Sequence, residues 1–208
     1  EDTVNGFAGV NWTLGGTHSV TSTNGYTFNN IEIVDVASQT LNGTDGDDAF
    51  TVNASAEVGA DSITFKNVAT VAASTGSDSV ETTGIGAELT GTENELKAAG
   101  ITFTGIDSAD LNGNSLLGSD LTDTFTLQSA SSASEAATVL LANEIAFKDL
   151  SSTIDAKGNQ DTVNGFAGVN WTLGGTNSVT STNGYTFNNI EIVDVASQTL
   201  NGTDGDDA

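Results

Sequence analysis

The sequence predicts an all-β fold, organised as a parallel β-solenoid. Runs such as residues 26–36 and 49–53 alternate apolar with polar residues and are rich in β-branched and aromatic side chains, which is the pattern of half-buried strands. Clusters of Gly, Asn and Asp separate these runs and predict tight turns. The chain of 208 residues has 24 Gly, no Pro and no Cys, a composition that suits many short strands joined by turns and excludes a disulfide framework.

A near-perfect internal duplication is the second observation. Residues 1–49 recur as residues 160–208, a period of 159 residues. The copies differ only where Glu1 becomes Gln160 and where His18 becomes Asn177. Such fidelity indicates an array of repeats, in which each unit is stabilised by its neighbours. Because the second copy stops inside a motif that the first copy continues to Phe50, we expect the sequence to be part of a longer array.

A weaker repeat lies inside the unit. The pattern apolar-x-Phe-x-x-apolar occurs around Phe28, Phe65, Phe103, Phe147 and Phe187. The pattern Asp-x-apolar begins at Asp2, Asp48, Asp78, Asp123 and Asp161. The two patterns interleave and predict four modules of roughly 40 residues per unit. The predicted first unit is residues 1–160, with modules at about 2–48, 49–78, 79–123 and 124–160, and residues 161–208 begin the second unit.

The spacing of these anchors favours coils of a solenoid. In such a fold the Phe and Val anchors would point inward as stacked columns, and the Asn, Asp and Gly that follow them would form the corners. Two coils per module give about eight coils per unit and an advance of roughly 38 Å. Tandem β-sandwich domains are the alternative, since Val4 to Val80 spans 76 residues and Val80 to Val163 spans 83.

Two segments carry helical signals. Residues 92–100 have Thr92 as a candidate N-cap, Glu95 as the partner in a capping box, and Gly100 as a stop. Residues 134–143 fit either a short helix or a strand. Both segments precede an apolar-x-Phe run, so we expect them to be short helical decorations at the corners of the β structure.

Charge limits the partners. The chain has 28 acidic residues, four lysines and no arginine, for a net charge of -24. Nucleic acid is therefore an unfavourable partner, because phosphate binding depends on Lys and Arg. No apolar run is long enough to span a membrane, so no membrane insertion is expected. A chain this acidic is better screened in a saline or calcium-containing exterior than in a low-calcium cytoplasm, which predicts an extracellular location.

The most distinctive chemical motif is residues 41–50, LNGTDGDDAF, with Asp45, Asp47 and Asp48 on a Gly-rich turn. Its second copy holds Asp204, Asp206 and Asp207. Carboxylates on a flexible loop are suitable ligands for Ca²⁺, so these residues are the candidate metal ligands. The alternative is that the aspartates cap turns.

At these residues the chain resembles the giant repetitive adhesins and secreted repeat proteins of bacteria, in which segments like FNNIEIVD (residues 28–35) and GTDGDDAF (residues 43–50) recur. The latter is also similar to one turn of the haemolysin-type nonapeptide that binds Ca²⁺ in β-rolls. That family stacks many nonapeptides, whereas here the motif stands alone, with residues 117–125 as a degenerate counterpart. The resemblance implies a β-solenoid or β-rich stalk, with Ca²⁺ as its cofactor.

Two other functions remain open. Trp12 and Trp171 would stack on sugar rings if exposed, but Val10, Trp12 and Leu14 share one face of a predicted strand and suit packing equally. An enzyme that degrades polysaccharide is disfavoured, because the chain lacks Arg and its single His18 is Asn177 in the second copy. A duplicated segment would also duplicate an active site, so we expect no catalytic activity.

These observations together predict a structural section of a long extracellular fibre or adhesin stalk, acting in cell-surface attachment or in a biofilm matrix. Its expected partners are neighbouring repeats of the same chain, and other copies that associate end to end or laterally. The alternatives are a repeat that binds surface glycans and a calcium-dependent surface-layer or matrix fibre.

Overall fold

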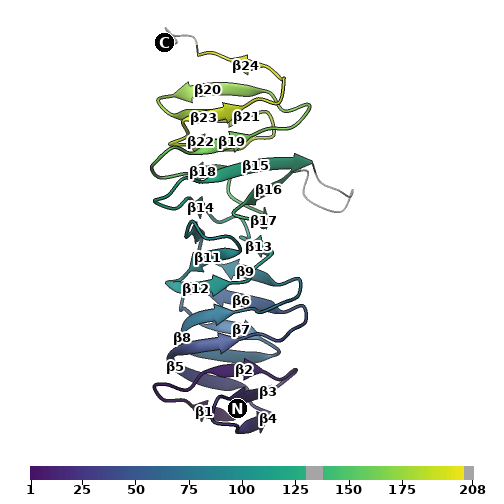
Figure 1. The fold of residues 1–208 in the computed structure, drawn as a ribbon, viewed down its shortest axis with the longest axis vertical. Coiled ribbons are helices and arrows are strands. Elements are labelled where there is room, and N and C mark those ends of the chain that lie inside the picture. Colours follow the sequence, from purple (N-terminus) through teal and green to yellow (C-terminus); the bar gives the residue numbers. More distant parts are fainter. Residues whose placement is uncertain (130–137, 204–208) are drawn as a thin grey trace.

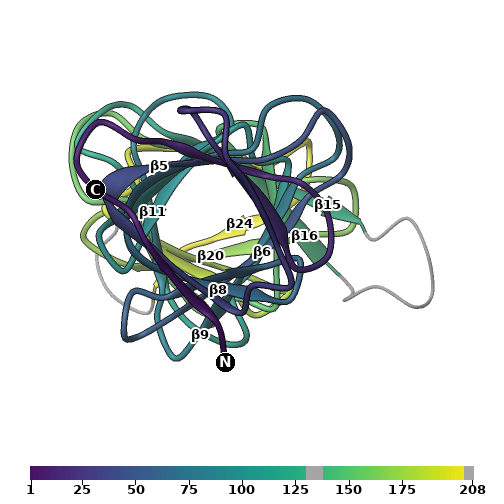
Figure 2. The same cartoon turned by 90° about the horizontal axis from the view of Figure 1, so that it is seen from below.

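The computed structural model describes residues 1–129 and 138–203. It confirms the fold class, because the described residues form strands and turns without a helix and wind into a parallel β-solenoid of about six turns. The molecule is an elongated column, with the N-terminus at its lower end and the last described strand, Leu200–Asn201, at its upper end (Figure 1). Viewed along the axis, the strands surround a central space (Figure 2). A continuous core of buried side chains fills it, from Val10 to Ile190. Tandem sandwich domains, the alternative fold, are therefore not formed.

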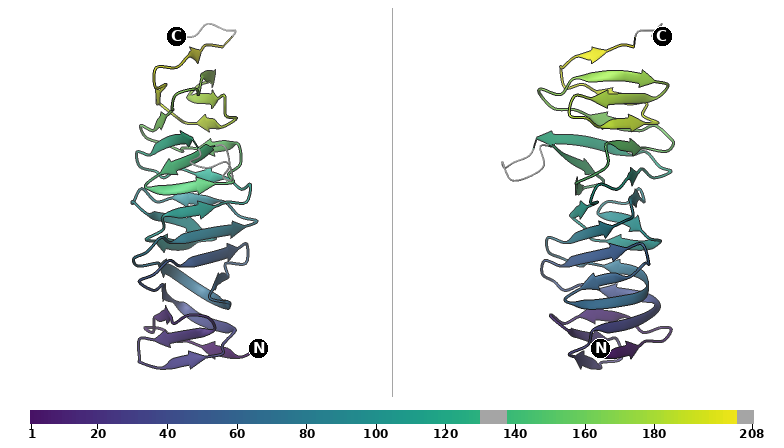
Figure 3. Two further views of the ribbon diagram at one scale, coloured as in Figure 1. Left: turned by 90° about the vertical axis from the view of Figure 1, so that its right-hand side faces the viewer. Right: turned by 180° about the vertical axis from the view of Figure 1, so that it is seen from behind.

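The strand pairings define two ladders that run along the column (Figure 3). Ladder A contains, from the lower to the upper end, β1 (Thr3–Asn5), the first part of β5 (Ile33–Asn42), the first part of β8 (Ile63–Ala72), β7 (Val58–Ala60), β6 (Ala49–Asn53), β9 (Ser79–Thr83), β13 (Ser108–Asp110), β17 (Ile145–Lys148), β16 (Thr138–Ala142), β15 (Thr124–Ser129), β19 (Thr162–Asn164) and β23 (Ile192–Asp194).

Ladder B contains, in the same direction, β4 (Thr27–Asn29), β3 (Ser19–Ser22), β2 (Trp12–Leu14), the last parts of β5 and β8, β12 (Ile101–Thr104), β11 (Glu95–Ala98), β10 (Ala87–Leu89), β14 (Leu116–Leu117), β18 (Thr153–Asp155), β22 (Thr186–Asn188), β21 (Ser178–Ser181), β20 (Trp171–Gly175) and β24 (Leu200–Asn201). Strands β5 and β8 contribute to both ladders because they bend at residues with positive φ, Ala37 and Ser38 in β5 and Asn67 in β8.

Antiparallel meanders of three strands interrupt the parallel winding, and they alternate between the ladders. The meanders β2–β3–β4, β10–β11–β12 and β20–β21–β22 lie in ladder B, and β6–β7–β8 and β15–β16–β17 lie in ladder A. We call each crossing of a ladder by the chain a pass. A simple pass adds one strand to the ladder, whereas a pass that forms a meander adds three. Each of the four predicted modules holds one meander.

The meanders determine how far each unit advances. Strand β19 is the copy of β1 and lies ten strands above it in ladder A, and β22 lies ten strands above its copy β4 in ladder B. At about 4.8 Å per strand, one unit advances about 48 Å. The sequence-based advance of 38 Å per unit was wrong, because it counted one strand per coil and missed those that the meanders add. The value of about eight coils per unit was also wrong, since the described chain has about six turns in all.

The apolar-x-Phe motifs form the third strand of each meander, and the predicted inward columns are confirmed. Phe65, Phe103, Phe147 and Phe187 are fully buried, and only Phe28, at the lower end, is partly exposed. In ladder A, Phe50, Val80, Ala109 and Phe147 lie above one another. Burying one such side chain contributes about 1.5–3 kcal/mol.

The predicted corners are also confirmed. The residue two positions after each of these phenylalanines has a left-handed backbone: Asn30 (φ 57°), Asn67 (φ 54°), Gly105 (φ 75°), Asp149 (φ 48°) and Asn189 (φ 58°). Gly, Asn and Asp tolerate this conformation better than other residues. The motif therefore combines a side chain that fills the core with a residue that turns the chain out of the strand.

The helix predicted for residues 92–100 was wrong. Glu95–Ala98 is strand β11, which pairs antiparallel with β10 and β12. Its side chains alternate, with Leu96 and Ala98 buried in the core, and Ala99 and Gly100 form a two-residue hairpin turn with positive φ at both positions. Pairing on both sides outweighs the local capping signal here. In residues 134–143, the described part forms strand β16, one of the two alternatives, and residues 134–137 lie outside the described residues.

Candidate functional site

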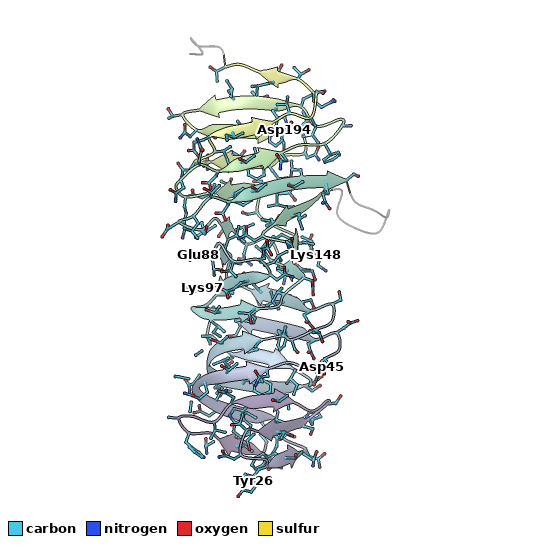
Figure 4. All side chains as sticks on the ribbon, viewed as in Figure 1. Tyr26, Asp45, Glu88, Lys97, Lys148 and Asp194 are labelled. Carbon is cyan, nitrogen blue, oxygen red and sulfur yellow. The ribbon has the colours of Figure 1, made fainter. Side chains whose placement is uncertain are left out.

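The aspartates of the Gly-rich turn before β6 are engaged with separate hydrogen-bond donors. Asp48 accepts the Thr44 backbone N–H at 2.7 Å and also the Thr44 hydroxyl. Asp45 accepts the Ser74 hydroxyl at 3.2 Å, and Asp47 accepts the Ser77 N–H at 2.8 Å. Ser74 and Ser77 belong to the turn above, so these carboxylates hold two successive turns together. Asp45 lies on the outer surface of the column (Figure 4).

Calcium binding at these aspartates stays a prediction. Ca²⁺ takes six to eight oxygen ligands that converge on one point. In residues 1–129 and 138–203, no three Asp, Glu or His side chains are grouped to hold a metal ion. The structure therefore supports turn capping by Asp45, Asp47 and Asp48. Asp204, Asp206 and Asp207, the second half of the predicted metal site, lie outside the described residues.

The degenerate counterpart of the motif repeats the same cap. Asp123 accepts the Ser119 backbone N–H at 2.6 Å and the Ser119 hydroxyl at 3.0 and 3.1 Å, as Asp48 does with Thr44. Both aspartates are buried and both immediately precede a ladder A strand, β15 and β6. The structural role of the motif is therefore a hydrogen-bonded cap, formed by a buried aspartate and a hydroxyl residue four positions before it.

These two aspartates belong to a larger feature, which we name the acidic corner. It consists of the acidic residue immediately before each ladder A strand that begins a pass: Asp2, Glu32, Asp48, Asp78, Asp107, Asp123, Asp161 and Glu191. Five of them were predicted from the Asp-x-apolar pattern, but their alignment in one column was not. The other three were missed because two are Glu and because Asp107 has the small residue Ala109 where the five have Val or Phe. An acidic residue at the start of every pass was the available signal.

Hydrogen bonds link the acidic corner along the axis. In each linked pair, the backbone N–H of the lower acidic residue donates to the carboxylate of the acidic residue one turn above. The pairs are Asp2–Glu32 (2.6 Å), Asp48–Asp78 (2.8 Å), Asp78–Asp107 (2.8 Å), Asp123–Asp161 (2.7 Å) and Asp161–Glu191 (2.9 Å). The carboxylates thus extend the backbone ladder by one bond at the point where the chain enters a strand.

Two members of the acidic corner carry an electrostatic cost. Asp78 and Asp161 are buried, and Oδ2 of each has no hydrogen-bond partner. Burial raises the pKa of both carboxyls, and the neighbouring carboxylates raise it further, although the N–H donated from the residue below opposes the shift. Folding therefore shifts the protonation equilibrium of these two carboxyls toward the protonated form, relative to the unfolded chain.

Both tryptophans are buried, so the interpretation of Trp12 and Trp171 as sugar-stacking residues is wrong. Their exposed fractions are 2% and 0%. The indole of Trp12 packs against Gly6, where a Cβ atom would lie 3.0 Å from Nε1, and Trp171 packs against Gly165 in the same way, at 2.8 Å. The two ring faces are covered by the core and are not available to a glycan.

The two ends of the column expose surfaces that are covered elsewhere in the same molecule. At the lower end, Phe7 is 62% exposed and Tyr26 is 67% exposed and points away from the column (Figure 4), whereas Tyr185, the copy of Tyr26, is partly buried. At the upper end, Leu200 is 46% exposed, whereas Leu41, its copy, is fully buried.

The fold and its repeated ladders define a β-solenoid repeat protein. Comparison of the chain with protein families, curated proteins and solved structures finds no match. The described part of the chain contains no helix that is long and apolar enough to cross a membrane.

Proposed function

We propose that the chain is a section of a long extracellular fibre or adhesin stalk, in which the 159-residue unit serves as a spacer. The junction between the two copies carries the proposal. Phe125 pairs with Val163 in ladder A, and Ile154 pairs with Phe187 in ladder B, both in parallel register. The second unit thus stacks on the first without a joint in either ladder, and added units lengthen one stiff column.

Charge supports the extracellular location. A net charge of -24 spread along a column makes neighbouring copies repel one another unless cations screen it. The three described ion pairs, Lys66–Glu57, Lys148–Asp110 and Lys157–Glu88, offset only a small part of this charge. Saline surroundings supply the screening, and the similarity of the motifs to bacterial adhesin repeats points the same way.

Electron microscopy of arrays with two, four and six units tests the proposal. The expected result is a continuous rod whose contour length grows by about 48 Å per unit. A diffraction layer line near 4.8 Å would accompany it. Discrete beads separated by flexible joints, or a length that does not grow in proportion to unit number, would contradict the spacer function.

A further inference from the structure

The upper end of the column presents one side of a contact that the chain makes twice elsewhere. In that contact a ladder A meander lies on a ladder B meander. The His18 N–H donates to the carbonyl of Asp61, in the hairpin turn between β7 and β8, at 2.9 Å, and the Asn94 N–H donates to the carbonyl of Asn143, between β16 and β17, also at 2.9 Å. His18 and Asn94 both have a φ of 54°. Asn177 occupies this place in the last meander, with a φ of 50°.

Two further elements recur in both contacts. The Thr64 N–H donates to the carbonyl of Glu32 at 2.8 Å, and in the second contact the Ala146 N–H donates to the carbonyl of Asp107 at 2.8 Å. A phenylalanine then lies over an apolar residue: Phe65 pairs with Val34, and Phe147 pairs with Ala109. The segment that follows the last meander presents the lower half of both elements, in Glu191 and Val193 of the β23 region.

An open groove of about 640 Å³ lies where the covering meander would sit. Its walls include Leu173, Val179, Ile190, Glu191 and Val193. The apolar copies of these residues in the first unit are Leu14, Val20, Ile31 and Val34, and all four are at most 9% exposed. Val179 and Ile190 are buried like their copies, whereas Leu173 and Val193 are only partly buried, so the groove is open at these two residues.

We propose that this groove is a docking site for a three-stranded meander with the sequence of residues 49–72, supplied by the next module of the array. The inference rests on the proposed spacer function and specifies which module the exposed end of the column recognises. The hairpin turn of this segment supplies a carbonyl to the Asn177 N–H. Its third strand supplies an N–H to the Glu191 carbonyl and places Phe65 over Val193. The recognition is strand addition to an open ladder edge, with one aromatic side chain giving specificity.

A ladder B meander is the wrong partner for this groove. In both precedents the covering meander belongs to ladder A, and its third strand donates an N–H to the carbonyl of an acidic-corner residue, Glu32 or Asp107. Residues 87–104 form a ladder B meander, which in the fold lies on β8 of ladder B and not on a ladder A strand. This segment is thus a matched control of the same architecture.

The test uses the full chain and a fluorescein-labelled peptide of residues 49–72. Fluorescence anisotropy is expected to show saturable binding with one peptide per chain. Hydrogen exchange of the complex is expected to show added protection at β23 and β24 and none at β5. Peptides carrying Phe65→Asp, or comprising residues 87–104, are expected to bind at least tenfold more weakly, which corresponds to about 1.4 kcal/mol. Absence of saturable binding, or equal binding by either control peptide, overturns the docking proposal.

A second arrangement avoids any self-association of the peptide. Residues 50–104 are joined to the C-terminus of the full chain, and hydrogen exchange at Ile192, Val193 and Leu200 is compared with the unextended chain. Protection that rises to the level of Val34 and Leu41 supports the proposal, and unchanged exchange overturns it. Extension by residues 87–104 is the control. Either outcome is distinct from failure of the spacer function, which would appear as beads or non-proportional contour length in the arrays.

Discussion

Residues 1–49 and 160–208 have almost the same sequence but different surroundings, and the comparison separates what a segment determines from what its neighbours determine. Phe28 is partly exposed at the lower end, whereas its copy Phe187 is fully buried by the turn beneath it. The relation reverses at the other edge, where Leu41 is fully buried and Leu200 is 46% exposed. Burial in this fold therefore depends on the adjacent layers, as expected for repeats stabilised by nearest neighbours.

Local geometry, in contrast, is the same in both copies. The Asn42 side chain donates to the Trp12 carbonyl at 3.0 Å, and Asn201 donates to the Trp171 carbonyl at 3.2 Å. Asp35 and Asp194 each accept the N–H two residues further on at 2.9 Å. Corners and turns are thus determined by the segment itself, while strand length is not: ten-residue β5 corresponds to the short strands β23 and β24.

The largest expected difference between the copies concerns the stacked phenylalanines. Phe187→Ala should lower the free energy of unfolding by about 3–5 kcal/mol, because it leaves a cavity in a closed core. Its ring lies 5.8 Å from that of Phe125 and 6.1 Å from that of Trp171. Phe28→Ala should cost about 1 kcal/mol, since this ring is already partly in water. Urea unfolding of both variants measures the difference, and equal losses would contradict the layer dependence of burial.

Hydrogen exchange should show the next largest difference. The amides of β5 pair with β8 above and with β1 and β2 below, so their exchange should require near-global unfolding. The amides of β23 and β24 have a paired strand only below, and they should exchange at least tenfold faster through local opening. Similar protection in the two copies would show that the upper end is stabilised by contacts other than strand stacking.

The left-handed corners offer a smaller comparison. Asn189→Ala should cost about 1–2 kcal/mol, because Ala disfavours the left-handed backbone and the variant also loses the 2.7 Å hydrogen bond from the Asn189 side chain to Asp155. Asn30→Ala has the same backbone penalty but should lose less stability in total, since no turn lies beneath Asn30. Chemical denaturation with Asn→Gly variants as controls isolates the backbone contribution, because Gly adopts this conformation freely. A larger loss of stability for Asn30→Ala than for Asn189→Ala would contradict this comparison.

The smallest expected effect is electrostatic. Burial raises the pKa of Asp161 above its value in the unfolded chain, so the cost of its charge is complete above the folded-state pKa and disappears as the pH falls to the unfolded-state pKa. Asp161→Asn keeps the acceptor for the Asp123 N–H and removes charge beside Asp123 and Glu191. It should raise the melting temperature at pH 7 by about 1–2 °C and leave it unchanged near pH 3. Asp2→Asn, at the exposed copy, should change neither value; destabilisation by Asp161→Asn at pH 7 would disprove the interpretation.

The features that could be predicted from the sequence are those with a local signal. Phe65 and Phe103 were placed in the core because each lies in an alternating run, and Asn67 and Gly105 were placed at corners because both residues favour turns. Residues 92–100 were mispredicted because pairing with two distant strands decides their conformation, and sequence patterns report little about such pairing. The acidic corner was missed for the same reason: its members are brought together only by the winding of the chain.

The alternation of meanders limits how a gene encoding such repeats can change in length. A single module such as residues 49–78 contributes three strands to ladder A and one to ladder B, so its loss would put the two ladders out of step by two strands. Loss or gain of two consecutive modules shifts both ladders by five strands, about 24 Å, and a whole unit shifts both by ten. Recombination between near-identical units therefore changes the reach of the column in fixed increments and leaves every remaining contact intact.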